Sequence, residues 1–450
     1  MNAVERLARF VQLPTVSSYS TQDEDANLFA SVPDLLAELY PTAHGVLERE
    51  LIGDRAIVYR WEGAEPSLPP MLGMAHYDVV PPGDEANWNR KPFAAEIDGG
   101  RIHGRGTLDD KGMLSAWLEA VDRAAARGEK PKRTLYLAFG GDEETLGTRG
   151  AAATAAEFAR RGLRFAFILD EGGAVAVDQL AAFTDRPVAL VGTAEKGYLT
   201  LRITARGMPG HASAPPKRTA IGRLGRAMAV LEDKPFPKRL TDVPAGMFRA
   251  LGRAVGGLKG FILSHPRLFA PIILKALSAN PSTSGMIRTT AAPTIVRGGE
   301  RDNVLPDAVE GYVNLRILPG ESVAGTVARV KRLVASVVDE DVEVEPLAES
   351  SFEPVPAGRA TPRHWNMFTD LVAKTWPGAV AAPYLMTATT DSRWYRDVTD
   401  AIFRFIPMEV TAEDAACVHA ANESISTAAW EKSVEFLESI ILYDPNEEPS

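Results

Sequence analysis

Continuous apolar runs alternate with helical patterns over the first 190 or so residues. The runs lie at 70–80, 133–144 and 165–173, and the continuous apolar stretch with which each begins is typical of strands that are buried on both faces. Between the first two runs, the segment 112–128 repeats apolar side chains at helical spacing, which predicts a helix. Strands that alternate with helices favour an α/β fold with a largely parallel, buried sheet.

Polar side chains gather where each apolar run ends. The runs finish in a histidine or in acids, which are His76 and Asp78, then Asp142, Glu143 and Glu144, then Asp170 and Glu171. In open α/β sheets, ligands bind beyond the carboxyl ends of the strands. We therefore expect three strands to deliver imidazole and carboxylate groups to one edge of the sheet.

The pattern changes near residue 195. The segment 197–207 alternates apolar and polar residues, as a strand with one solvated face does. The elements that follow complete the order β-α-β-β-α-β, with the later ones expected at 219–231, 294–299, 310–318, 322–338 and 342–346. This order predicts a second domain over 196–350, with a helical insertion at about 235–285. The first domain is then formed by 1–195 and 351–450.

Composition excludes several classes of protein. The chain has 49 Lys and Arg against 59 Asp and Glu, a net charge of −10, which argues against a general nucleic-acid binder. No apolar run reaches the roughly 18 residues of a membrane span, and the charge-interrupted, amphipathic N-terminus does not resemble a signal peptide. Cys417 is the only cysteine, so no intrachain disulfide can form. A reducing compartment is the simpler interpretation, and we expect a cytoplasmic protein.

Two imidazoles and three carboxylates form the central group of candidate ligands: His76, Asp109, Glu144, Asp170 and His419. This donor set suits divalent metals, with zinc the first candidate and manganese or cobalt the alternatives. Five ligands can serve two metals if one carboxylate bridges them, and such paired metals share a water whose pKa they lower. Each acid alone would be more typical of a solvated or ion-paired strand end, but the set favours a metal site.

Six stretches carry a family resemblance: GMAHYDVVPPG, IHGRGTLDDKGM, FGGDEETLGTRGA, FILDEGG, GMPGHASAPP and CVHAANESIS. Their order resembles the dinuclear zinc metallopeptidases that include glutamate carboxypeptidase, succinyl-diaminopimelate desuccinylase, acetylornithine deacetylase, carnosine dipeptidase and the aminoacylases. The chain is most similar to the carboxypeptidase S branch, which also contains enzymes that make and hydrolyse N-fatty-acyl amino acids. The resemblance implies an aminopeptidase-like three-layer α/β/α catalytic domain with an inserted ferredoxin-like α+β lid or dimerisation domain.

The resemblance also implies a role for each ligand. Asp109 would bridge both metals, His76 and Asp170 would complete one site, and Glu144 and His419 would complete the other. A cis peptide bond would follow the bridging aspartate and join it to Asp110.

Two acids near these ligands are candidates for other work. Side chains of adjacent residues on extended backbone point opposite ways, so Glu144 can hold metal while Glu143 faces the substrate water. We therefore expect Glu143 to be the general base, which takes the proton of the water and gives it to the leaving amine. Asp78 lies two residues after His76 and could fix the tautomer of its imidazole, although a strand-end cap is the alternative.

The family resemblance extends to substrate recognition. His211 would reach the active site of a partner subunit and stabilise the oxyanion, which implies a homodimer through the lid domain. Asn303 matches a position that contacts the substrate carbonyl or carboxylate, and Arg316 in the following strand is a weaker candidate. Arg393 lies in a stretch that resembles the one near the substrate carboxylate, where it could form a bidentate pair.

These observations predict a two-metal hydrolase that cleaves an amide or peptide bond next to a free carboxylate, in a small molecule or a short peptide. A deacetylase or desuccinylase of a biosynthetic intermediate is the alternative within the enzymes. A metal-dependent binding protein without catalysis is the alternative from another class, and the complete ligand set with Glu143 counts against it.

The insertion has an unusual composition, because no Asp or Glu occurs from Pro244 to Pro281 while five Lys and Arg do. A membrane-surface helix and a wall of an acyl-chain pocket are two interpretations. We favour a third, a helical pair packed on the small domain with its charges in water.

Overall fold

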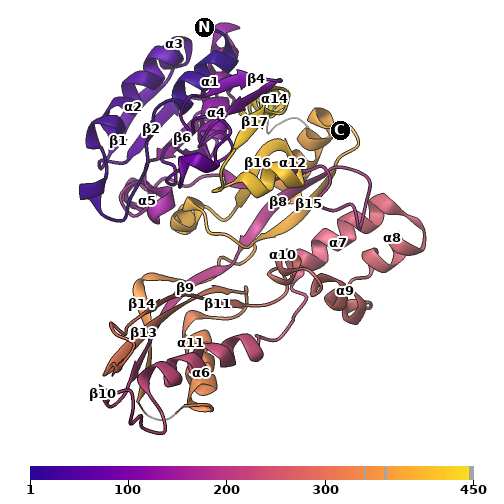
Figure 1. Ribbon diagram of the computed structural model, residues 1–450. Helices are drawn as coiled ribbons and strands as arrows, with labels where there is room; N and C mark the ends of the chain where they lie inside the picture. The colour runs from indigo at the N-terminus through magenta and orange to yellow at the C-terminus, as the bar shows by residue number, and fades with distance from the viewer. Residues whose placement is uncertain (339–340, 359–361, 445–450) are drawn as a thin grey trace.

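The computed structural model describes residues 1–338, 341–358 and 362–444. Its larger body is built on an eight-stranded sheet of order β1-β2-β6-β3-β7-β16-β8-β15 (Figure 1). The strands are β1 (Glu48–Ile52), β2 (Ala56–Trp61), β3 (Met71–His76), β6 (Leu135–Gly140), β7 (Phe167–Ala176), β8 (Val188–Glu195), β15 (Val380–Met386) and β16 (Ile402–Val410).

The central strands β6, β3, β7 and β16 run parallel, as predicted, but the flanks do not. Strands β1 and β2 form an antiparallel pair joined by only three residues, 53–55, a connection too short for a parallel crossover. On the other side, β8 runs antiparallel to β7 and β16, and β15 is parallel to β8. The sheet is therefore mixed, and the prediction of a largely parallel sheet holds for its centre.

Helices cover both faces of this sheet. Within β3, Met71 and Ala75 pack in one apolar cluster while Leu72 and Met74 pack in another, because side chains alternate across a strand. The first cluster also takes apolar residues from α1 (Ala3–Val11), α2 (Ala26–Leu39), α3 (Pro41–His44), α4 (Lys111–Ala126), α12 (Pro362–Thr375) and α14 (Thr427–Ile441). The second takes them from α5 (Ala151–Arg160) and the 3-10 segment η4 (Asp391–Asp397). The α/β/α layering is therefore present, and the sheet core is buried on both sides.

The smaller body has an antiparallel sheet of order β11-β13-β9-β14. Along the chain its elements are β9 (Gly197–Arg206), α6 (Ala220–Asp233), β11 (Thr290–Arg297), β13 (Ala308–Ile317), α11 (Val323–Ala335) and β14 (Val342–Phe352). This is the predicted β-α-β-β-α-β order. Side chains of β9 alternate between buried and half-buried over most of its length, and the buried ones meet both helices in a core of their own.

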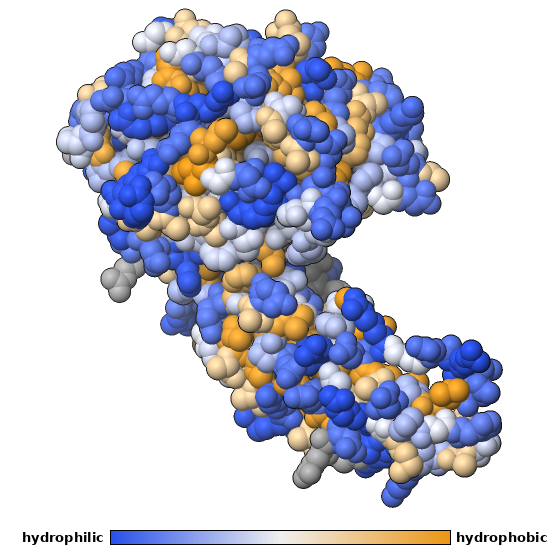
Figure 2. Space-filling view, turned by 90° about the vertical axis from the view of Figure 1, so that its left-hand side faces the viewer, coloured by the Kyte–Doolittle hydropathy of each residue, from blue (hydrophilic) through white to orange (hydrophobic). Residues whose placement is uncertain are grey.

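The two bodies meet at a narrow waist, where β8 leads directly into β9 (Figure 1). An isolated bridge between Glu195 and Val355 pairs the outgoing and returning chain there. Figure 2 shows the larger body above and the elongated smaller body below, with a concave gap opening between them. Short elements complete the fold: β4 (Glu96–Asp98), β5 (Arg101–His103) and β17 (Ser424–Ser426) in one sheet, β10 (Gly210–His211) with β12 (Val304–Leu305), and α13 (Ala412–Cys417).

The insertion forms α7 (Asp242–Val255), α8 (Gly257–Ser264), α9 (Ala270–Leu277) and α10 (Pro281–Ser284). Among the described residues, its main apolar contacts are with the large sheet and not with the small domain, so the interpretation of a helical pair packed on the small domain was wrong. Met247 and Phe248 of α7 share an apolar cluster with Val188 of β8 and Ala382 of β15. The insertion thus covers the β8–β15 flank of the large sheet, whose apolar side chains would otherwise meet water.

Over the residues that the structure describes, no helix combines the length and apolar character that crossing a bilayer requires.

Candidate active site

The carboxyl ends of three parallel strands meet at one edge of the large sheet. His76 is the last residue of β3, and the 3-10 turn η3 (Glu143–Thr145) begins just beyond the end of β6. Asp170 and Glu171 lie within β7 on the other side of β3. The predicted convergence of imidazole and carboxylate groups is therefore found in the structure.

Asp109 lies between two histidines and meets each with a different oxygen. His76 Nε2 is 3.0 Å from Asp109 Oδ1, and His419 Nε2 is 2.9 Å from Asp109 Oδ2. The second histidine also approaches Glu144, with 3.2 Å from Nε2 to Oε1. A cis peptide bond joins Asp109 to Asp110, as the resemblance implied. This arrangement suits a carboxylate that bridges two cations.

Glu171, and not Asp170, lies beside His76. Its Oε1 is 3.8 Å from His76 Nε2, and His76, Glu143 and Glu171 form one of two described groups whose potential ligand atoms all lie within 4.8 Å of one another. The other group is His76, Asp109 and Glu144. The Asp170 carboxylate is buried and instead accepts a hydrogen bond from Ser392 N at 2.8 Å. Because adjacent side chains on a strand point to opposite faces, only one of the two acids can face the histidine.

Asp78 holds the turn that carries the two glutamates. Its fully buried carboxylate accepts hydrogen bonds from Glu143 N and Glu144 N at 3.1 Å each, and from Ser17 Oγ at 2.7 Å. His76 Nδ1 lies 3.0 Å from the Asp78 backbone oxygen and 3.4 Å from its Oδ1. The expected support of the imidazole is therefore shared with the backbone, while the support of the glutamate turn was not visible in the sequence.

The cluster carries more buried negative charge than its histidines offset. Burial raises the pKa of Glu171, and the neighbouring Asp109 raises it further. Burial acts on the Asp109 carboxyl in the same direction, but hydrogen bonds from His419 and His76 bring its pKa below the ordinary value. Glu144 Oε1 is buried and, among the described atoms, has no hydrogen-bond partner of good geometry. A divalent cation would supply the missing partner and offset the charge, so these residues fit a metal centre.

Comparison with known proteins decides the family. The model of "Peptidase family M20/M25/M40" matches residues 72–443. This chain belongs to peptidase family M20/M25/M40. It is 34% identical to the N-fatty-acyl-amino acid synthase/hydrolase of Homo sapiens, over 99% of this chain and 88% of that protein. It is 27% identical to carboxypeptidase S of Saccharomyces cerevisiae, over 98% of this chain and 84% of that protein.

Solved structures agree on the fold. An M20 family metallo-carboxypeptidase from Sulfolobus solfataricus superposes with a TM-score of 0.71 at 17% identity, covering 99% of this chain and all of that one. Human carnosine dipeptidase 1 gives 0.69 at 14% identity, covering 98% and 95%. The predicted family and α/β fold are confirmed. As a member of M20/M25/M40, the chain is a metal-dependent hydrolase of amide or peptide bonds.

Arg393 supports the turn that carries the two glutamates. It is buried, and its Nη1 and Nη2 donate to the backbone oxygens of Thr390 at 2.6 Å and Leu146 at 2.7 Å. These bonds tie η4 to the turn after Glu144 and use one N–H of each terminal nitrogen. The side chain therefore positions the active-site turn, and its contact with a substrate carboxylate stays a prediction.

Arg316 is the second predicted candidate for that contact. Its guanidinium lies 4.3 Å from the ring centre of Tyr198, and its Nε donates to Asn314 Oδ1 at 3.1 Å. Its terminal nitrogens make no hydrogen bond to the part of the chain that the structure describes. Tyr19 is largely exposed and lies within electrostatic range of both this arginine and the two glutamates: partial desolvation raises its pKa, the charges of Tyr198, Glu143 and Glu144 add to the rise, and Arg316 opposes it. Neither tyrosine was predicted, because only the fold brings them there.

His211 and Asn303 lie together at the far end of the smaller body. The β10–β12 pair aligns His211 with Val304, and Ala212 N donates to the Asn303 backbone oxygen at 3.0 Å. His211 is exposed, and its Nδ1 lies 2.7 Å from Ser213 Oγ. From the waist to the end of β9 the chain travels about 30 Å at 3.3 Å per residue, and Figure 1 shows β10 beyond it. Within one chain, neither residue reaches the candidate metal centre.

Proposed function

We propose that this chain hydrolyses the amide bond of N-acyl amino acids, with the C-terminal peptide bond of short peptides as the second substrate class. The observation that carries the proposal is the position of Glu143, which shares a ligand group with His76 and Glu171 and is fixed through its backbone by Asp78. The similarity to an N-fatty-acyl-amino acid hydrolase and to carboxypeptidase S supports these two classes, both of which leave a free carboxylate beside the scissile bond.

Two divalent ions, with zinc as the first candidate, would be held by His76, Asp109, Glu144, Glu171 and His419. Ions bound there would polarise the scissile carbonyl and lower the pKa of the attacking water. Glu143 accepts the proton of that water on its carboxylate and donates it to the nitrogen of the leaving amino acid. Burial raises the pKa of Glu143, and the charge of Asp391 raises it further.

The same proposal assigns the recognition groups. Arg316, with its free terminal nitrogens, faces the free carboxylate of the substrate, and Tyr198 fixes the plane of the guanidinium. His211 and Asn303 act on the substrate in the active site of a second subunit, because they do not reach the active site of their own chain. A homodimer joined through an edge strand of the small sheet, β11 or β14, would bring them there. We also place the protein in the cytoplasm, in line with its single cysteine.

A panel of N-acyl amino acids of increasing acyl length, set beside dipeptides, tests the substrate class. We expect the protein to hydrolyse N-acyl amino acids. A chelator should abolish this activity, and added zinc should restore it. Glu143→Ala should retain the metal and lose turnover by about 10²-fold or more. Turnover that survives this substitution, or that survives the chelator, would contradict the assignment.

Mixed dimers test the role of His211. His211→Ala and Glu143→Ala subunits should each be poorly active alone. Mixed together, they should recover activity, because one of the two active sites then combines Glu143 with His211 from the other subunit. If mixing restores nothing while mixed dimers are shown to form, the contribution from the second subunit is refuted.

A further inference from the structure

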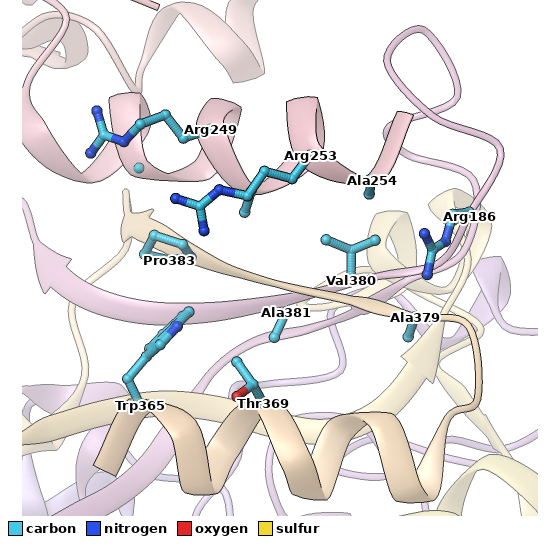
Figure 3. A pocket seen from close by; sticks show the side chains of 12 residues that line it. Arg186, Arg249, Arg253, Ala254, Trp365, Thr369, Ala379, Val380, Ala381 and Pro383 are labelled. Atoms are coloured by element: carbon cyan, nitrogen blue, oxygen red, sulfur yellow. The ribbon is translucent and has the colours of Figure 1, made fainter. Parts of the chain in front are cut away.

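A second cleft lies apart from the candidate metal centre, between the insertion and the large sheet. It is about 430 Å³ in volume and is walled by α7 on one side and by α12 and the first half of β15 on the other (Figure 3). None of the proposed metal ligands lines it. Its charged side chains are all arginines, namely Arg186, Arg249 and Arg253, and no acid occurs among the described residues that line it. In a chain of net charge −10, this is a local concentration of positive charge.

Two of the arginines lie on the same face of one helix, where their charges repel each other. Arg249 and Arg253 are four residues apart on α7, so their side chains lie on one face, where like charges repel by a few tenths of a kcal/mol. Among the described residues, neither forms an ion pair or a hydrogen bond. Figure 3 shows Arg253 extending from α7 toward β15, while Arg249 extends along the helix. Across the cleft, Arg186 is oriented by a hydrogen bond of 2.7 Å from its Nε to the Gly378 backbone oxygen, which leaves its terminal nitrogens available.

The opposite wall is apolar. Trp365 rises from α12 toward Pro383 of β15, and Val380 lies further along the same strand (Figure 3). These side chains are only half-buried, so the cleft exposes hydrocarbon beside its guanidinium groups. Figure 3 shows Arg186 at one end of the cleft and Arg249 at the other, so the polar groups are spread along an apolar wall. A few polar groups in a mostly apolar setting are characteristic of small-molecule sites.

We propose that this cleft binds an anionic amphiphile, a molecule with a carboxylate or phosphate head and a hydrocarbon body. The guanidinium groups match the geometry of an oxyanion and would gain the partners that they lack within the chain. The hydrocarbon body would lie on Trp365 and the β15 wall. Because the cleft is shared by α7 and the large body, the bound molecule would also join the insertion to the sheet that it covers.

Titration calorimetry on the intact protein tests this site. The probes are decanoate and decyl phosphate. Two control probes are decanol, which lacks the anionic head, and inorganic phosphate, which lacks the hydrocarbon body. The variant R249Q/R253Q removes two charges from the cleft. The matched control K259Q/K275Q removes two charges from α8 and α9 of the same insertion, at positions that do not line the cleft. Binding in the candidate active site is common to all three proteins and cancels in the comparison.

We expect the wild type and K259Q/K275Q to bind one molecule of decanoate or decyl phosphate per chain that R249Q/R253Q does not bind. Alternatively, R249Q/R253Q binds this molecule at least tenfold more weakly. Whichever head group binds more tightly identifies the head. Equal binding by the cleft variant and the control would overturn the proposal. So would decanol or inorganic phosphate binding as tightly as the amphiphiles. R249Q/R253Q relieves a repulsion, so it should fold and keep its hydrolytic activity, which shows that a lost equivalent reflects the cleft.

Discussion

Replacing Asp78 by Ala tests how the glutamate turn is held. The substitution removes the acceptor of Glu143 N, Glu144 N and Ser17 Oγ. The hydroxyl can turn to another acceptor, but the two amides are fixed by the backbone. At about 1.5 kcal/mol for each hydrogen bond to a charged group, the loss of both lowers the free energy of unfolding by about 3 kcal/mol. His76 keeps the backbone oxygen of residue 78 as a partner, so we expect the main effect on Glu144.

Loss of a group that orients metal ligands typically lowers metal affinity by about 10- to 100-fold, and we expect a fall in this range for D78A. Competition with a chromogenic chelator measures the affinity, and urea denaturation measures the stability. Asp122→Ala is the matched control. Asp122 is also buried, accepts a hydrogen bond from Ala43 N at 2.8 Å and pairs with Arg6, but it touches none of the ligands. A folded D78A variant with wild-type metal affinity, or an equal loss of affinity in the control, would show that Asp78 does not position the metal ligands.

Three further predictions concern other buried charges. Glu171→Ala should lower the metal content from two ions per chain to one, while Asp170→Asn should keep two; elemental analysis distinguishes them, and the reverse result would restore Asp170 as the ligand. The buried Arg404 Nε lies 2.8 Å from the Glu195 carboxylate, so Glu195→Ala would leave the arginine charge buried without a partner. The free energy of unfolding, measured by urea denaturation, should fall by about 3–5 kcal/mol. Unchanged stability would contradict the pairing. Burial lowers the pKa of Lys196 from 10.5 to about 7. Between these two pH values the unfolded chain binds one proton more than the folded chain, so the free energy of unfolding should rise with pH by up to about 1.4 kcal/mol per pH unit relative to the K196M variant. Identical pH slopes for the wild type and K196M would refute this.

The elements that depend on local sequence pattern could be predicted from the sequence. Each of three apolar runs became a buried central strand, and the polar residues at their ends met because the strands are parallel neighbours. The alternation along 197–207 likewise became β9, with its buried side chains on one face. Period and strand direction are local properties, so these elements and the position of the site could be predicted.

The remaining features depend on contacts between distant segments. The two acids of the FILDEGG stretch look equivalent in sequence, and the side of β7 that faces His76 selects Glu171. The bonds of Arg393 to Thr390 and Leu146 fix the active-site turn, and the second of them joins residues that lie 247 positions apart and so leaves no signal in the sequence. The docking of the insertion could not be foreseen, since the edge strand β15 that it covers was not itself predicted.

We propose that five side chains from distant segments hold a pair of metal ions. Titration of chelator-treated protein with zinc counts the ions bound at saturation. We expect two ions per chain in the wild type and the loss of both in Asp109→Ala, because that carboxylate faces His76 with one oxygen and His419 with the other. A wild type that binds no zinc, or an Asp109→Ala variant that still binds two ions, would contradict it.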